Sequence, residues 1–315
     1  MMNNNPDPSP PESPPAPNLR PGGRGFLEWL AVFSESKAGM IGLCGIVFFF
    51  LLAVMHPVLL RTVWNPAVYD PLTPGRPNPP PNPAPPSAAH WLGTDPFGND
   101  VLSQLMYGAG SALLLGAVAA VVTVVLATGA GAAAAYYGGM LDAFLMRLAD
   151  LILMTPLLVI LIFLAMFFDL QLIHLAVWIG VFSGLGGTVL VMKAQALSIR
   201  SRTYIDAARA AGASGPRILI RHIIPHLAPL AFLYMMFTVT EAVFAEAVLS
   251  YFGLINVKIT WGTMIHTAAA SGYLLRPDVW WLVLPAGVCI TLLCSSFYLV
   301  GRTLEGIVHP RLRIR

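Results

Sequence analysis

Charged residues are scarce in this chain. Only 10% of its 315 residues are Asp, Glu, Lys or Arg, whereas 57% are hydrophobic. Because an average soluble domain carries about 25% charged residues, this composition excludes an ordinary soluble protein and indicates an integral membrane protein. The net charge is only +3, and the basic residues lie beside apolar runs. Membrane lipid is therefore an expected partner, whereas nucleic acid is not.

Cysteine is equally scarce. The three cysteines, Cys44, Cys289 and Cys294, all fall in apolar runs, which predicts buried thiols and not a disulfide framework or a metal site. Among the seven histidines, His222 and His226 stand at i and i+4. They lack a third ligand nearby in sequence, so no metal site is assigned.

Catalytic motifs are also missing. The sequence has no GxxxxGK phosphate loop ending in Ser or Thr, no HExxH, no CxxC pair and no GxSxG elbow. No catalytic residue is therefore assigned, no cofactor is expected in this chain, and a membrane-embedded enzyme is a poor interpretation. Residues 1–25 are polar and rich in proline. They show no cleavable signal peptide and are expected to form a disordered cytoplasmic tail.

Long apolar runs are what the sequence has in abundance. A hydrocarbon core of about 30 Å requires about 20 apolar residues per helix, and lipid leaves no partner for the backbone of an open strand. The sequence therefore predicts an all-α membrane protein with six transmembrane helices. The predicted crossings are residues 38–60, 111–136, 141–168 with an interruption at Pro156, 172–192, 227–252 and 279–299.

The segments between the crossings complete the predicted organisation. Residues 26–37 are amphipathic and too short to span, which favours an interfacial helix. The Pro-rich residues 61–99 predict an extended loop outside the membrane, either a spacer or a docking surface for an external partner. A core at residues 100–300 holds the other five crossings, and a basic tail follows at residues 301–315.

The positions of Lys and Arg predict the orientation. If the N-terminus is inside, only Arg61, Arg76, Lys258 and Arg276 of the 18 basic residues lie outside. This excess of inside charge predicts that both termini are cytoplasmic, together with the polar loop at residues 200–225.

The loop at residues 200–225 is the most polar segment between two crossings. It predicts a helix from Tyr204 to Ala211 that Gly212 ends, then a turn, then a second helix from Pro216. Four alanines leave one face of the first helix without bulk, so that it fits a groove on a partner protein. The alternative is an ordinary solvated loop that obeys the positive-inside rule.

The order of residues in this loop resembles a known signature. Asp206-Ala207-Ala208, then Gly212, then Ile224-Pro225 is similar to the cytoplasmic loop of ABC importer permeases, with Asp206 in place of glutamate and Ile224 in place of leucine. Arg221-His222-Ile223-Ile224-Pro225 resembles the peptide-transporter version. The resemblance implies that the following residues couple the chain to an ATPase: Tyr204, Asp206, Ala207, Ala208, Arg209, Gly212, Arg221 and Pro225.

Two further stretches carry the same resemblance. Leu92-Gly93-Thr94-Asp95, Gly98 and Asp100-Val101-Leu102-Ser103 match the segment before the second crossing of peptide-importer permeases, and Pro310-Arg311-Leu312-Arg313 matches their usual ending. Asn99 and Gln104 stand where arginine is usual. Thr94 or Asp95 is expected to cap the helix that follows.

The resemblance implies a type I ABC importer transmembrane domain, the second (C-type) permease of a dipeptide, oligopeptide or nickel-type importer. It further implies a multi-pass protein of the bacterial inner membrane. The implied partners are a homologous permease in a heterodimer, two ABC ATPase subunits that hold ATP and Mg, and an extracytoplasmic solute-binding protein. The substrate stays open between peptides, nickel chelates, oligosaccharides and other solutes. The second permease stays open between a different chain and a second copy.

Two carboxylates lie within a predicted crossing. Ionisable groups at membrane depth seldom face lipid. Glu246 matches the family pattern and Glu241 does not, and five positions place them about 140° apart on a helix. Either they bond to neighbouring helices, or Glu246, and less surely Glu241, faces the translocation path and admits a cationic substrate group.

An ATPase-independent secondary transporter or channel subunit is the alternative function. It predicts inverted repeats and charged or broken helices at mid-membrane, neither of which is evident in the sequence.

Overall fold

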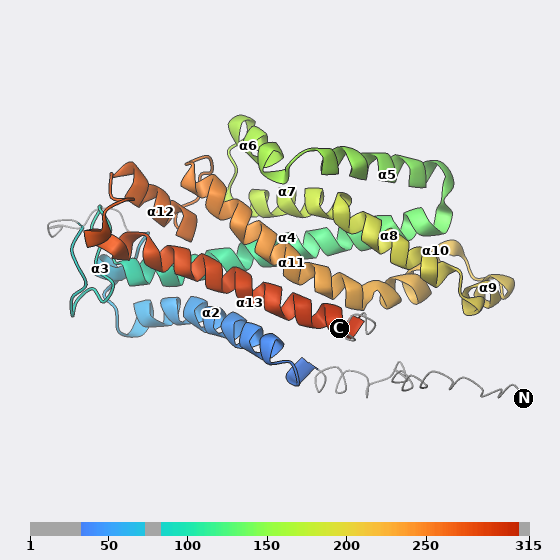
Figure 1. Cartoon of the computed structure of the whole chain (residues 1–315), viewed down its shortest axis with the longest axis horizontal. Helices are drawn as coiled ribbons and strands as arrows, with labels where there is room; N and C mark the ends of the chain where they lie inside the picture. Colours follow the sequence, from blue (N-terminus) through green and yellow to red (C-terminus); the bar gives the residue numbers. More distant parts are fainter. Residues whose placement is uncertain (1–32, 73–82, 309–315) are drawn as a thin grey trace, which may run out of the picture.

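The computed structural model describes residues 33–72 and 83–308, and within these ranges the chain is helical and forms no strand (Figure 1). The expected tail at 1–25, most of the expected helix at 26–37 and the last residues of the basic tail lie outside the described residues. The elements are α2 (Lys37–Thr62), α3 (Pro66–Tyr69), α4 (Val101–Tyr137), α5 (Gly139–Met154), α6 (Leu157–Phe167), α7 (Leu172–Leu185), α8 (Gly187–Arg200), α9 (Thr203–Ala210), α10 (Gly215–Ile218), a π-helical turn (Leu219–Ile223), α11 (Ile224–Tyr251), α12 (Trp261–Ala270), a 3-10 turn (Pro277–Leu282) and α13 (Leu284–Val308).

Four helices of the described chain are long and apolar enough to cross a membrane: α2, α4, the continuous helix from α10 through α11, and α13. Two further pairs qualify only as bent spans, since α5 and α6 meet at 87° and α7 and α8 at 44°. The structure therefore supports an all-helical membrane protein with four to six crossings. A count of six requires that each bent pair crosses once.

The long helix α4 lies at the centre of the bundle and packs against α2, α7, α8 and α11. Small residues permit this close approach. A Cβ added at Gly131 of α4 would lie 2.8 Å from the Cβ of Met192 in α8, and one at Gly180 of α7 would lie 2.6 Å from the Cβ of Val122 in α4. Glycine at these contacts lets the backbones meet, as is common where helices pack in lipid.

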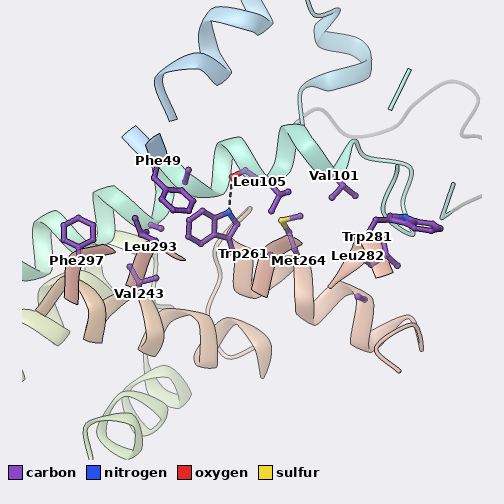
Figure 2. Close-up of a cluster of buried hydrophobic side chains, with 14 of the residues drawn as sticks. Phe49, Val101, Leu105, Val243, Trp261, Met264, Trp281, Leu282, Leu293 and Phe297 are labelled. Atoms are coloured by element: carbon purple, nitrogen blue, oxygen red, sulfur yellow. Dashed lines mark hydrogen bonds between the residues drawn. The ribbon is translucent and has the colours of Figure 1, made fainter. Parts of the chain in front are cut away.

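A core around Trp261 closes the end of the bundle at which α12 lies (Figure 2). The indole of Trp261 is 2% exposed, and its Nε1 donates to the carbonyl oxygen of Leu105 at 3.0 Å. Phe49 packs edge-on at 5.5 Å between ring centroids. Gly108 leaves the space beneath, because a Cβ there would lie 2.7 Å from the indole Cδ1. These contacts lock α12 to α2 and α4.

The segment before α4 is folded against the core. Asp100 caps α4 by accepting from the amide of Ser103 at 2.8 Å, so the predicted cap at Thr94 or Asp95 is wrong. Asp95 accepts instead from Asn99 Nδ2 at 2.9 Å and Gln104 Nε2 at 2.7 Å. The two amides that stand where arginine is usual thus hold the buried carboxylate of Asp95, and Asp100 is the cap because α4 begins directly after it.

The cysteines are free thiols in the described chain. Cys289 and Cys294 are half-buried, whereas Cys44 is exposed, contrary to the prediction. Cys44 lies on α2, which turns one apolar side away from the bundle. An apolar side chain on the outward face of a membrane helix contacts lipid. The apolar run around Cys44 therefore does not require that its thiol is buried in protein.

Both bent spans break at residues unsuited to a helix interior. Pro156 stands between α5 and α6, as the sequence predicted. The bend at Gly186, between α7 and α8, differs from the single unbroken crossing that the sequence predicts over residues 172–192. The two breaks touch: a Cβ added at Gly186 would lie 3.1 Å from Cγ2 of Ile152 in α5. The helices therefore bend at the same level of the bundle.

Candidate functional site

The short helix α9 lies at the end of the molecule opposite α12, beyond the long helices (Figure 1). It begins and ends one residue before the predicted limits. Gly212 follows with φ of +81°, a left-handed conformation that ends the helix at little cost for glycine. The loop between the crossings is therefore an ordered helix and not only a stretch of solvated charge.

One buried side chain anchors α9. Ile205 is 0% exposed and belongs to a cluster with Ile218, Ile223 and Leu227 of the helix that runs into α11. Residues of α4, α8 and α13 complete the cluster. Packed interiors resist deformation, so this cluster holds α9 firmly against the helices around it.

Basic residues join the loop to the end of α4. The Arg209 guanidinium lies 5.2 Å from the ring centroid of Tyr136, within cation–π range. Arg200 Nη1 donates to the carbonyl oxygen of Ala135 at 2.6 Å. Ala135 belongs to the last turn of α4, where the helix dipole favours a cation. These two contacts fasten α9, through Arg209, and the end of the preceding helix α8, through Arg200, to the central helix α4.

Tyr204 joins α9 to the start of α11. Its ring stacks on His226 at 6.0 Å and tilts over His222 at 6.4 Å between centroids, and His222 contributes its carbonyl oxygen to a 2.6 Å contact with His226 Nδ1. The two histidines thus have a packing partner. No group of three candidate metal ligands occurs among the described residues.

Most of the predicted coupling residues are exposed, on α9 or at the start of the helix that runs into α11. Asp206, Ala207 and Ala210 of α9 are exposed, and Ala208 is half-buried. Arg209 Nη1 pairs with Asp206 Oδ1 at 3.3 Å along the helix. The structure places two predicted residues off α9: Arg221 in the π-helical turn and Pro225 in the first turn of α11, both exposed. The outer face of α9, defined here as Asp206, Ala207, Ala210 and Ala211, is free of large side chains.

The carboxylate of Glu246 is enclosed by protein. It is 3% exposed and accepts from Ser250 Oγ at 2.5 Å. Ser250 Oγ in turn accepts from Thr260 Oγ1 at 3.4 Å, and Thr260 caps α12. Glu246 therefore lies where α11 meets α12. The direct hydrogen bond of Glu246 thus stays within α11 and reaches α12 only through Ser250, and the place of Glu246 on a translocation path stays a prediction.

Glu241 points to the other side of α11 and is exposed. Ser183 Oγ of α7 donates to its Oε2 at 2.9 Å. A cavity of about 240 Å³ opens beside this pair and is lined by residues of both helix breaks. Ser183 and the glycine break were missed at the sequence level. The Ser-Gly-Leu-Gly-Gly run at residues 183–187 is the signal that marks them, since paired glycines weaken a helix.

The fold defines a multi-pass helical membrane protein with a small helix projecting from one end. Comparison with known proteins narrows this class. Residues 125–314 match the family described as binding-protein-dependent transport system inner membrane component. The chain belongs to this family, and it is a membrane permease subunit of an ABC importer in the bacterial inner membrane.

Curated relatives agree with this assignment. The chain is 31% identical to the oligopeptide transport system permease protein OppC of Bacillus subtilis, over 89% of this chain and 88% of the relative. It is 30% identical to the dipeptide transport system permease protein DppC of the same organism, over 89% and 83%. It is 34% identical to OppC of Escherichia coli K12, over 71% and 73%. The resemblance read from the sequence motifs is thus confirmed.

The family implies ATPase and solute-binding partners. The alternative of an ATPase-independent transporter predicted broken helices at mid-membrane, and the structure contains two bent pairs. Family membership nevertheless places the chain among binding-protein-dependent systems, so the breaks belong to a permease.

Proposed function

We propose that this chain forms half of the translocation path for peptides or related small solutes and receives motion from partner ATPases through the outer face of α9. The relatives named for oligopeptide and dipeptide transport support the substrate class. The observation that carries the coupling role is geometric. The outer face of α9 is bare, while its inner side is fixed by Ile205 to a cluster that includes α4, α8 and α11.

In this mechanism the chain itself hydrolyses nothing. ATP and Mg bind to the two partner ATPases, whose closure displaces α9. The contacts of Tyr204 and Arg209 carry that displacement to α11 and α4. Rigid helices then rock between two arrangements and expose the path to alternate sides, as in other two-state switches.

The proposed topology follows from the basic residues. With both termini and α9 in the cytoplasm, each bent pair counts as one crossing and the chain crosses six times. The end of the bundle that carries α12 then faces outward, toward the solute-binding protein. A homologous permease, as a heterodimer, completes the path on the side of the chain that its own helices leave open.

The coupling role is tested by adding bulk to the outer face of α9. Ala207→Trp fills an exposed position and leaves Ile205 in place, so the chain should fold while its ATPase subunits bind poorly. Ala270→Trp is the matched control, because Ala270 is exposed at the end of α12 on the opposite side of the molecule. The measurement is recovery of ATPase subunits with the tagged permease, together with uptake in proteoliposomes.

We expect Ala207→Trp to reduce ATPase recovery at least about tenfold, since a clash worth about 1.4 kcal/mol already has that effect. The Ala270→Trp variant should recover the subunits normally. Equal recovery with both variants, accompanied by normal uptake, would contradict the coupling role.

A further inference from the structure

The cavity beside Glu241 has an unusual lining for a membrane protein. Its walls come from the two helix breaks and include Ile152, Thr155 and Pro156 on one side and Phe182 and Gly186 on the other. Ser183 lies on the α7 side and donates to Glu241, which reaches the cavity from α11. Apart from these two side chains and Thr155, the side chains of the residues that line it in the described structure are apolar.

The depth of Glu241 restricts what can cover it. The helix α11 ends at Tyr251, and a rise of 1.5 Å per residue places Glu241 about 15 Å from that end. This distance is half of the roughly 30 Å hydrocarbon core. An exposed carboxylate at this depth is strongly disfavoured against lipid. The face of α11 that bears Glu241 must therefore meet water or a polar group.

The charge of the cavity depends on the helix ends at the two breaks and on the side chains that line it. Each break brings together one helix C-terminus and one helix N-terminus, so the backbone dipoles largely offset each other. Glu241 is the one charged side chain among the described residues that line the cavity. Ser183 occupies one side of a single carboxylate oxygen, which leaves acceptor positions on the other oxygen. When Glu241 is ionised, the cavity therefore carries a net negative charge.

We propose that Glu241 and Ser183 form a binding site for the primary ammonium group of the transported substrate, such as the N-terminal amino group of a peptide. The carboxylate accepts from the ammonium, and Ile152 and Phe182 pack against the adjoining carbon atoms. This inference rests on the proposed function as a substrate path. Glu246 is enclosed by protein and has no comparable access.

Thiol chemistry tests the site in the assembled importer, independently of transport. In a background with Cys44, Cys289 and Cys294 replaced by alanine, Ser183→Cys is treated with the aminoethyl and sulfonatoethyl methanethiosulfonate reagents. Each rate is normalised to that of a small free thiol. The aminoethyl reagent should react faster, and adding Glu241→Gln should lower the cation-to-anion rate ratio about tenfold, since a unit charge only a few Å away is removed.

Uptake of a peptide with a free amino terminus gives the second readout. Glu241→Gln should lower uptake about tenfold for the same electrostatic reason, mainly by raising KM, while Glu241→Asp retains most of it. If position 183 reacts with neither reagent, or the rate ratio is unchanged by Glu241→Gln, the site is overturned. A failure of the wild-type complex to bind ATPases or to take up peptide would instead overturn the proposed function.

Discussion

The two sides of α11 differ in how completely the chain covers them. Toward α12, Glu246 is enclosed by protein. Glycine at position 262 lets the backbone of α12 approach α11 closely, because a Cβ there would lie 2.6 Å from the Cβ of Ser250. Toward α5 and α7, Glu241 is exposed, and α5 buries only Ala149 of its own residues while Met154 is 80% exposed. One helix thus joins a closed scaffold to a surface that the described part of the chain leaves uncovered.

This difference separates stability from transport. The scaffold side has its partners within the chain, so substitutions there should change the free energy of unfolding. Glu241 and the exposed residues of α5 have few partners within the chain, so substitutions there should change uptake and leave the fold intact. A pair of variants that reversed these outcomes would break the comparison.

The largest effect on stability is expected for Trp261→Ala. Removing a large buried aromatic side chain typically costs about 3 to 5 kcal/mol, and the Leu105 carbonyl also loses its donor. Trp91→Ala is the control, because Trp91 is 73% exposed. Denaturant unfolding of the purified chain in mixed micelles measures both. Similar losses for the two tryptophans would show that the α12 end is not a packed core.

The two carboxylates of α11 sharpen the comparison directly. Glu246→Ala leaves the Ser250 hydroxyl without its acceptor and should cost about 1 to 3 kcal/mol of stability. Glu241→Ala removes an exposed group and should stay within about 0.5 kcal/mol, while uptake falls sharply. Unfolding and uptake are measured in parallel for the Glu246→Ala and Glu241→Ala variants. A Glu241→Ala chain that unfolds readily but transports normally would contradict the assignment of the two faces.

A smaller effect is expected at the end of α9. Gly212→Ala forces a side chain into the left-handed conformation, which costs about 1 to 2 kcal/mol, although the space around it is open. The strain is local, so coupling of ATP hydrolysis to uptake should weaken more than overall stability. Gly306→Ala in α13 also meets open space, without positive φ, and should leave coupling unchanged. Equal coupling in the two variants would argue against a fixed α9.

The smallest effect is expected at Asp278, near the scaffold but exposed. The hydrogen bond from the Arg276 guanidinium lowers the pKa of Asp278 below its ordinary value. Any stabilisation from this pair is present above the unfolded-state pKa of about 3.9 and is lost as pH falls through the lower folded-state value. Because exposed ion pairs contribute little, Asp278→Asn should not measurably change the melting temperature at pH 7. A clear drop would show that charge, and not packing, holds this end.

Local patterns predicted much of the fold. Hydropathy located the long helices, Gly212 located the end of α9 within one residue, and Pro156 located one break. These features depend on residues adjacent in the chain, so the sequence carries them directly.

Tertiary contacts decided the features that the sequence did not reveal. Asp95 does not cap α4 because the helix begins directly after Asp100, five residues further along the chain, while Asn99 and Gln104 bind the Asp95 carboxylate. The break at Gly186 depends on its contact with Ile152 across two helices. The prediction ranked Glu246 above Glu241 as a path residue, and neither periodicity nor charge could show which carboxylate α12 would enclose.

The central claim is that the outer face of α9 is the surface that a partner ATPase grips. A photo-reactive residue placed at Ala207 in the assembled importer, with one at Ala270 for comparison, tests it most directly. The account predicts that illumination links position 207 to an ATPase subunit and that position 270 yields no such product. Linkage of position 207 only to lipid or to the solute-binding protein would contradict it.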